Sequence, residues 1–358
     1  MAQPNHDPNT TTQPLVRWYI DTRPLTQTTT ALPLLETLQP NDQETVRKFY
    51  HQKDKHMSLA SNLLKYLFVH RTCRIPWADI TISRTPAPHR RPCFVPTHAQ
   101  QARNPAAPNV EFNVSHQASL VALAGTAVPC SSSRTQPSHP TPQVGIDITC
   151  VNERQGKPSS SDPEARTLTA FNNYVDIFSE IFSAPQIATI KSLHGAPQSL
   201  LGQAQGRPPP CLVEYGYRLF YTYWALKEAY IKMTGEALLA PWLRDLEFTN
   251  VIAPAAAEVG PPPPPQQQQH GDDDGDEGDR LFGEPYRDVR TTLNGEVVGD
   301  VRIEVVAFGG DYLIATAARG ARVGADGGDE EDLWLPFEKM DIERDIRPCA
   351  MGGCRCLG

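Results

Sequence analysis

The segment Leu219–Lys232, with the sequence LFYTYWALKEAYIK, constrains the fold of this chain more than any other stretch. It contains neither glycine nor proline, and its aromatic residues recur at helical spacing. Positions 224, 227, 228, 231 and 235 stand three or four residues apart, so a helix places them on one broad face. The pattern predicts a long helix around which the rest of the chain is organised.

Charged side chains form a compact group on this predicted helix. Lys232 lies one turn beyond Glu228, and Lys227 is next to Glu228 in the sequence. A carboxylate flanked by two ammonium groups and backed by aromatic residues suits a metal ion held beside an anionic ligand. An ordinary core helix with a solvated Glu–Lys pair shows the same pattern, and this helix alone favours that simpler interpretation.

The composition leaves room for a polyanionic ligand. A chain of 358 residues is long enough for two domains with a substantial core. Its net charge is −8, but the ten acidic side chains within residues 272–279 and 329–332 account for more than all of it. The remainder is close to neutral, so the overall acidity does not exclude a local basic pocket.

The eight cysteines are scattered, although three of them, Cys349, Cys354 and Cys356, crowd the C-terminal end. They lack the two matched pairs of a typical zinc motif, and the polar N-terminus is no secretory signal. Metal binding and lipidation of the terminal cysteines stay open, although the ending CRCLG does not fit prenylation. No apolar run approaches the ~18 residues of a membrane span. We expect a soluble, cytoplasmic protein with free thiols.

Alternating and helical patterns, interrupted by low-complexity stretches, predict an α/β (α+β) protein made of two similar halves. A strand, a polar turn and an apolar strand occur in FNVSHQASLVALAG and again in VVAFGGDYLIATAA. This repeated strand–turn–strand pattern suggests pseudo-twofold symmetry, with a ligand cleft between the halves. The predicted parts are a disordered N-terminus (1–14), an N-terminal α/β half (15–128), a Ser/Pro-rich linker (129–142), a C-terminal α/β half (143–319) with a disordered insertion (253–283), and a Gly-rich acidic tail (320–358) that holds a possible short helix near Trp334–Met340.

Polar residues at two predicted strands suggest a site for a phosphate and a cation. Ser115 and His116 follow a strand end, where a hydroxyl, an imidazole and turn amides can meet a phosphate. Asp147 lies in the apolar strand VGIDI, where burial of its carboxylate needs a cation or another partner. Gly145 leaves room for close approach of a backbone or a ligand. The structural alternatives are that Ser115 and His116 only stabilise a turn, and that Asp147 caps a neighbouring helix or pairs with a buried lysine.

Taken together, these stretches favour chemistry on a diphosphate. Asp147 and Glu228 fit a hard divalent cation such as Mg²⁺. Lys227, Lys232 and His116 then supply positive charge to a breaking P–O bond. The basic segment from Arg84 to Pro92 suits a terminal phosphate, although on its own it is a solvated loop. Walker-type and kinase motifs are absent, which disfavours ordinary nucleoside triphosphate chemistry.

These motifs resemble the Sfp-type 4′-phosphopantetheinyl transferases, in their broad-specificity fungal form. The resemblance runs from about Trp18 to Ala318 and rests on ordered motifs. These are KFYHQKDKHMSL (48–59), the Arg91–Pro92 step, FNVSH (112–116), VGIDI (144–148) and W-x-x-K-E-x-x-x-K (224–232). It implies transfer of the phosphopantetheine arm from coenzyme A to a serine of an acyl or peptidyl carrier domain, with release of 3′,5′-ADP. The carriers implied are polyketide synthases, nonribosomal peptide synthetases and aminoadipate reductase.

The resemblance also implies roles for single residues. Asp147 and Glu228 would bind Mg²⁺, and Glu228 would also help to deprotonate the carrier serine. Lys232 and His116 would serve catalysis at the phosphates. The coenzyme A ligands implied are Ser58, Arg84, Arg91, Ser115, His116, Lys227 and Lys232.

Two positions depart from the family pattern. Thr149 stands where some bacterial members carry a second acid, so water or the Thr149 hydroxyl would fill the gap and the third metal ligand stays open. Asp42 and Thr45 replace basic residues near the adenosine end. The alternative function is a non-catalytic carrier-binding or regulatory protein, but such a module would not need an acid pair facing two lysines. No nucleic acid or membrane partner is expected, and pseudo-symmetry within one chain favours a monomer.

Overall fold

The computed structural model describes residues 14–87, 89–128, 141–152, 167–201, 210–236, 240–255, 281–320, 323–324 and 332–357. The predicted disordered N-terminus, the linker up to residue 140 and most of the insertion predicted at 253–283 lie outside the described residues. No described helix has both the length and the apolar character needed to cross a membrane.

The first half is a four-stranded sheet covered by a long helix. Its strands lie in the order β12-β1-β5-β4, and all neighbours are antiparallel except the parallel pair β1 and β12. Leucines spaced three and four apart bury one side of helix α3 against this sheet. The elements are β1 (Leu15–Asp21), α1 (Arg23–Thr28), α2 (Pro40–Arg47), α3 (Gln52–Cys73), β2 (Ser83–Arg84), β3 (Pro92–Cys93), α4 (His98–Arg103), β4 (Asn109–Gln117), β5 (Leu120–Val128) and β12 (Trp334–Lys339).

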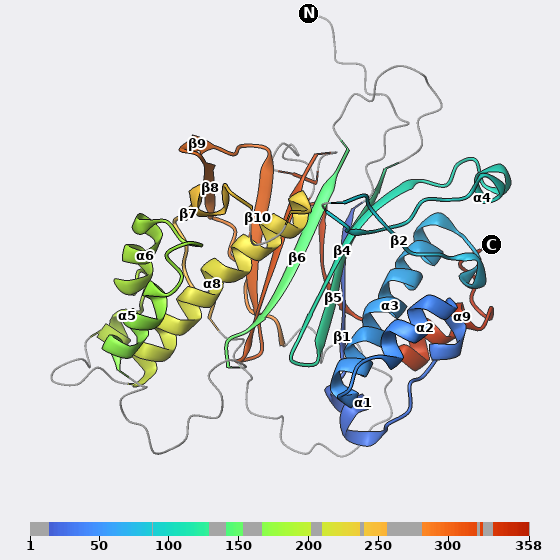
Figure 1. The fold of residues 1–358 in the computed structure, drawn as a ribbon, viewed down its shortest axis with the longest axis horizontal. Coiled ribbons are helices and arrows are strands. Elements are labelled where there is room, and N and C mark those ends of the chain that lie inside the picture. The colour runs from blue at the N-terminus through green and yellow to red at the C-terminus, as the bar shows by residue number, and fades with distance from the viewer. Residues whose placement is uncertain are drawn as a thin grey trace, which may run out of the picture.

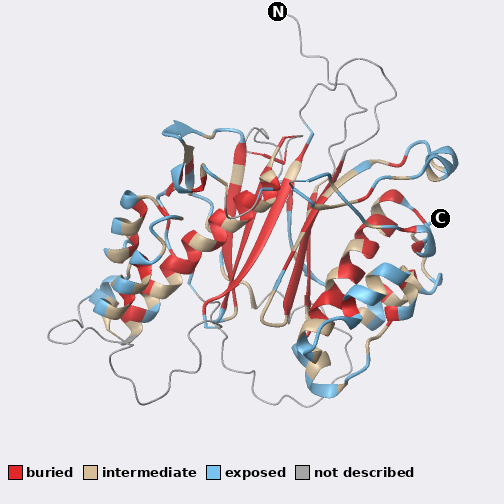
Figure 2. Ribbon diagram, in the orientation of Figure 1, coloured by how far each residue is buried: buried red, intermediate tan, exposed pale blue. Residues whose placement is uncertain are grey.

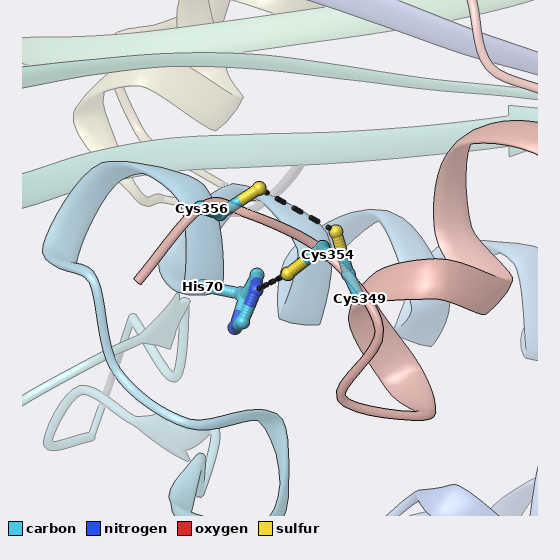
Figure 3. A group of neighbouring side chains, drawn as sticks. All are labelled: His70, Cys349, Cys354 and Cys356. Atoms are coloured by element: carbon cyan, nitrogen blue, oxygen red, sulfur yellow. Dashed lines mark hydrogen bonds between the residues drawn. The ribbon is translucent and has the colours of Figure 1, made fainter. Parts of the chain in front are cut away.

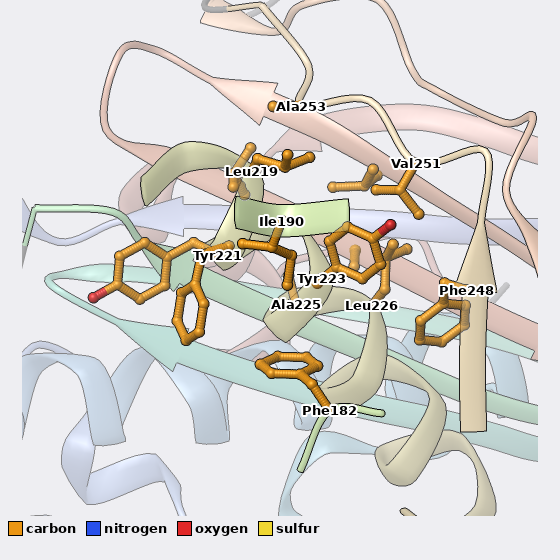
Figure 4. Close-up of a cluster of buried hydrophobic side chains, with 14 of the residues drawn as sticks. Phe182, Ile190, Leu219, Tyr221, Tyr223, Ala225, Leu226, Phe248, Val251 and Ala253 are labelled. Atoms are coloured by element: carbon orange, nitrogen blue, oxygen red, sulfur yellow. The ribbon is translucent and has the colours of Figure 1, made fainter. Parts of the chain in front are cut away.

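The second half places helix α8 on the antiparallel sheet β10-β11-β6. Helix α8 contains the whole predicted segment Leu219–Lys232, and its aromatic residues pack between the sheet and two smaller helices. Figure 4 shows Tyr221 and Tyr223 of this cluster near Phe182 and Ile190. A small separate sheet, β7-β8-β9, flanks this core. The elements are β6 (Gln143–Cys150), α5 (Leu168–Asp176), α6 (Ala184–Lys191), α7 (Gln198–Leu201), α8 (Pro210–Thr234), β7 (Leu246–Thr249), β8 (Arg290–Leu293), β9 (Glu296–Val297), β10 (Val301–Phe308) and β11 (Tyr312–Arg319).

The two sheets share a third core. This core takes side chains from β1 and β5 of one sheet and from β6, β10 and β11 of the other. The strands therefore occupy the middle of the molecule, with α3 on one side and α8 on the other (Figure 1), and their buried residues form a continuous central layer (Figure 2). In each half the chain runs through a strand, a long helix and a hairpin, and the first strand pairs with the last. The mixed α/β class is thus confirmed, while the twofold relation and the cleft stay predictions that this shared topology supports.

The sheets meet along β4 and β6, a junction that we call the seam. Strand β4 does not offer backbone carbonyls to β6; instead, side-chain oxygens on alternate β4 residues accept hydrogen bonds from alternate backbone N–H groups of β6. The pairs are Glu111 with Val144, Asn113 with Ile146 (3.3 Å), Ser115 with Ile148 (3.1 Å) and Gln117 with Cys150 (2.9 Å). Because buried N–H groups need acceptors, this ladder holds the two halves in one parallel register.

The C-terminal segment belongs to the first half. The sequence suggested a short helix near Trp334–Met340, but residues 334–339 form strand β12, which pairs with β1. Pairing at the free edge of β1 outweighs local helical preference. Beyond β12, a π-helical turn (Ile342–Ile346) and helix α9 (Arg347–Ala350) return to pack against α3.

Candidate functional site

Helix α8 contacts β6 most closely at Gly145. A Cβ atom added to this glycine would lie less than 3.0 Å from the carbonyl oxygen of Ala229 and from the backbone nitrogen of Met233. The missing side chain therefore lets the backbone of α8 lie directly on the strand. The space that the sequence suggested at Gly145 is filled by this helix.

The close approach brings Lys232 to Asp147. The Lys232 Nζ donates to Asp147 Oδ1 at 2.7 Å and to Ser115 Oγ at 2.8 Å. The second carboxylate oxygen, Oδ2, accepts from Thr149 Oγ1 at 2.7 Å. Asp147 is only 5% exposed, so its charge is stabilised by an ammonium and hydroxyl donors rather than by bulk water. Residues from β4, β6 and α8 thus converge at the seam.

Glu228 and His116 lie beside this group. Glu228 is half-buried and precedes Lys232 by one turn of α8, which places both on the same side of the helix. His116 follows Ser115 on β4 and reaches solvent. Desolvation by the surrounding protein lowers the pKa of the His116 imidazole, and the charges of Lys232 and Lys65 lower it further.

A second set of cations extends toward α3. Burial lowers the pKa of Lys65 to about 8, and the charge of Arg84 acts in the same direction against that of Asp42. Ser58 lies two turns earlier on α3, on the face that carries Lys65. Lys65, Arg84 and the hydroxyl of Ser58 therefore offer two cationic side chains and a hydrogen-bond donor that suit an anionic ligand.

Comparison with known proteins identifies the chain. Residues 24–128 match the family described as "4'-phosphopantetheinyl transferase, N-terminal", and residues 143–271 match the "4'-phosphopantetheinyl transferase superfamily". The chain is 60% identical to "4'-phosphopantetheinyl transferase NpgA" of Emericella nidulans over 96% of both chains. This chain belongs to the 4′-phosphopantetheinyl transferase family. It is an enzyme of that type, and the family's reaction transfers phosphopantetheine from coenzyme A to carrier proteins.

Two further relatives of the transferase show the range of the family. The chain is 54% identical to "4'-phosphopantetheinyl transferase A" of Aspergillus fumigatus, again over 96% of both chains. It is 24% identical to the human "L-aminoadipate-semialdehyde dehydrogenase-phosphopantetheinyl transferase" over 80% of this chain and 68% of the human one. The resemblance inferred from the motifs is therefore confirmed at the level of the family.

Lys227 of the transferase does not join the site. Its ammonium group donates to the carbonyl oxygens of Leu243 and Leu246, both at 2.6 Å, and lies over the ring of Phe182. The side chain is 1% exposed, and burial lowers its pKa to about 7. Adjacent helical residues point about 100° apart, so Lys227 enters the core of the second half and holds the 243–246 segment to α8. We therefore leave it out of the substrate contacts proposed below.

The two arginines expected at the adenosine end differ from each other. Arg84 is exposed, and one of its contacts is a hydrogen bond of 3.1 Å to the carbonyl of Arg90. Arg91 is half-buried at the seam, where it pairs with Glu111 and donates to the carbonyls of Met233 and Val144, both at 3.0 Å. Arg91 therefore ties the loop before β3 to both halves, and its predicted contact with coenzyme A stays a prediction.

Two residues that the motifs did not single out as ligands take part in the geometry. Lys65 supplies a cation near His116, and its distance of seven residues from Ser58 was the available signal. The sequence offers the Thr149 hydroxyl only as one candidate to replace the missing acid, and in the structure this hydroxyl donates to Asp147. Its position two residues after Asp147 on a strand places both on one face.

Proposed function

We propose that the transferase binds the diphosphate of coenzyme A against the Asp147–Lys232 pair and releases 3′,5′-ADP after transfer. The main support is the buried carboxylate held by Lys232 and Ser115 across the seam between the halves. Charged groups interact more strongly with a phosphate when water is excluded from them, so a buried pair suits a polyanion better than a solvated surface pair does. Lys65 extends the positive charge along the same side, and the His116 imidazole, whose lowered pKa favours its neutral form, adds a hydrogen-bond donor.

The oxygen donors also suit Mg²⁺. Asp147 and Glu228 come from β6 and α8, which the Gly145 contact holds together, and the Thr149 hydroxyl lies within reach of the same carboxylate. Hard carboxylate and hydroxyl oxygens are the donors that Mg²⁺ prefers, together with phosphate oxygens and water. When bound, the ion would neutralise charge on the diphosphate.

The protein's own groups would then act on the carrier serine. Glu228 accepts the proton of the serine hydroxyl, directly or through one water, as the serine oxygen forms a bond to the phosphorus of the pantetheine phosphate. The bond from that phosphorus to the bridging oxygen breaks, and the electron pair leaves with 3′,5′-ADP. Lys232 and His116 stabilise the charge that develops on the phosphate oxygens.

The adenosine end is expected to lie along α3. Ser58, Lys65 and Arg84 provide a hydroxyl and two cations there for the 3′-phosphate. We further propose that the enzyme is a cytoplasmic monomer, and that polyketide, nonribosomal peptide and aminoadipate-reductase carriers are its protein substrates. The match to the human relative supports the last of these carriers.

Intact-mass spectrometry of an apo carrier domain tests the proposal. The carrier is incubated with the transferase, coenzyme A and Mg²⁺, and we expect a gain of one phosphopantetheine group that a chelator abolishes. A folded enzyme that binds coenzyme A yet modifies none of several unrelated carriers would favour the alternative, a non-catalytic carrier-binding protein. Turnover that persists without divalent ions would remove Mg²⁺ from the proposal.

The variant Glu228→Gln distinguishes a transferase from a non-catalytic carrier-binding protein more sharply. We expect turnover to fall about 100-fold, because the amide cannot accept the serine proton, while carrier binding changes little. Stopped incubations followed by mass spectrometry measure turnover, and fluorescence anisotropy of a labelled carrier measures binding. Glu214→Gln, the same change near the other end of α8, serves as the control. Normal turnover by Glu228→Gln would show that this carboxylate is not the base.

The lowered pKa of Lys65 predicts that coenzyme A binding depends on pH. With a pKa of about 8, free Lys65 is mostly charged at pH 7 and mostly neutral at pH 9. If only the charged form binds the phosphate, KM for coenzyme A rises up to about tenfold over this interval. Lys65→Arg keeps its charge and should flatten the rise, whereas Lys48→Arg, at the exposed residue that follows α2, should not. An unchanged slope in Lys65→Arg would contradict the assignment.

A further inference from the structure

Four metal-binding side chains meet where the C-terminal segment returns to α3, far from the Asp147 group in the sequence. We call them the tail cluster; its members are His70, Cys349, Cys354 and Cys356. Their ligand atoms all lie within 4.8 Å of one another, and Figure 3 shows the three sulfur atoms and the imidazole converging from the tail and the end of α3. The site proposed for phosphopantetheine transfer includes none of these groups.

The distances suit a tetrahedral ion. Zinc–sulfur bonds of about 2.3 Å place tetrahedral sulfur ligands about 3.8 Å apart. The sulfur atoms of Cys349 and Cys356 are 3.8 Å apart, and the Cys354 sulfur lies 3.1 Å from Nε2 of His70. Small adjustments of side-chain torsions would bring all four atoms to bonding distance. Three sulfurs and one imidazole nitrogen are a donor set typical of structural zinc.

The surroundings of His70 orient it as a ligand. Its Nδ1 lies 2.8 Å from the carbonyl oxygen of Ile75, and a carbonyl can only accept, so the proton sits on Nδ1. Nε2 then carries an unprotonated lone pair, which is directed at the Cys354 sulfur. A backbone carbonyl that fixes the tautomer and orientation of a histidine is the usual support for a metal-bound imidazole.

Arg71 balances the charge of such a site. Three thiolates, one neutral imidazole and Zn²⁺ carry a net charge of −1. The Arg71 side chain hydrogen-bonds the Cys349 sulfur and also donates to the carbonyl of Asp345 at 3.0 Å. A cation is therefore already placed against the cluster, and it connects α3 to the turn that precedes α9.

A disulfide explains the arrangement less well. The sulfur atoms of Cys349 and Cys356 are farther apart than the bonded distance of about 2.05 Å, and all three cysteines are free thiols. A disulfide between Cys349 and Cys356 would also not explain why the Cys354 sulfur lies against the His70 imidazole.

We propose that the tail cluster is a structural Zn²⁺ site that fastens the C-terminal segment to α3. Binding would release the three thiol protons to solvent and form three zinc–sulfur bonds and one zinc–nitrogen bond. The segment so fastened includes β12, which completes the sheet of the first half beside β1. The ion would stabilise the fold without taking part in phosphopantetheine transfer.

Zinc content of the full chain, purified without a metal-binding tag and under reducing conditions, is the first test. We expect about one zinc ion per chain by elemental analysis. The double variant Cys354→Ser with Cys356→Ser should lose it, whereas Cys211→Ser on α8, outside the cluster, should keep it. Zinc retained by the double variant would overturn the proposal, as would a Cys349–Cys356 disulfide in peptides mapped without reduction.

Cobalt uptake by the wild-type chain provides a test that does not depend on variants folding. Metal-free enzyme titrated with Co²⁺ should develop thiolate-to-cobalt charge-transfer absorption that saturates at about one equivalent. Carboxylate ligands such as Asp147 cannot produce this absorption. Removal of zinc should also lower the midpoint of thermal unfolding by at least about 5 °C. Reduced enzyme that shows no such absorption would refute the site, whatever its transferase activity.

Discussion

Asp147→Asn is expected to lower kcat/KM at least about 1,000-fold, equivalent to about 4 kcal/mol of transition-state stabilisation. The carboxylate accepts from Lys232 on one oxygen and from Thr149 on the other. The amide has nearly the same shape but carries no charge, and its NH₂ group would face donors. The variant therefore loses both the proposed metal ligand and the partner that positions Lys232. Rates are measured by mass spectrometry of the carrier over time.

The matched control for this substitution is Asp176→Asn. Asp176 pairs with Lys191 at the surface of the second half, where ion pairs contribute little. Asp176→Asn should leave the transferase activity and the midpoint of thermal unfolding unchanged. Circular dichroism and thermal unfolding of Asp147→Asn separate catalysis from folding, since a buried pair that loses one partner can also destabilise the protein. Near-normal turnover by folded Asp147→Asn would place the reaction elsewhere.

Gly145→Ala is expected to destabilise the enzyme by about 3 kcal/mol and to abolish most of its activity. The added methyl group would meet the backbone of Ala229 and Met233, which cannot rotate away as a side chain could. Helix α8 must therefore move off β6, and this movement separates Lys232 from Asp147. Urea unfolding measures the loss of stability, and activity is compared at equal concentrations of folded protein.

Gly299→Ala is the control for this backbone contact. No heavy atom lies within 4 Å of the position that its Cβ would occupy, and its φ is not among the positive values. The substitution should change stability by no more than about 0.5 kcal/mol. If Gly145→Ala were tolerated equally well, the close approach of helix and strand would not be what positions the site.

The arrangement of the two halves explains why the site depends on backbone contacts. Its groups come from β4, β6 and α8, and they meet only because the seam sets the register of β4 against β6. Arg91 adds a second connection, from the loop before β3 to the end of α8. Substitutions in the ladder are thus expected to affect catalysis through position rather than through substrate contact.

The sequence by itself determined the local elements and the family, and it predicted the main acidic and basic candidates for the site. Helical and alternating apolar patterns predicted α3, α8 and the hairpin β10–β11, because these periods follow from backbone geometry. The motifs at Val144–Ile148 and Trp224–Lys232 identified Asp147, Glu228 and Lys232. An aspartate inside an apolar strand is costly unless it is paired, and that cost made it recognisable without a structure.

Only the tertiary structure decided what depends on the relative placement of distant segments. Lys227 and Lys232 look equivalent on a helical face, but the carbonyls of residues 243 and 246 bind one and Asp147 binds the other. Strand β12 forms because β1 offers an unpaired edge, and the tail cluster exists because α9 returns to His70. Spacing along a chain sets local periodicity, whereas partners hundreds of residues away are brought together by packing alone.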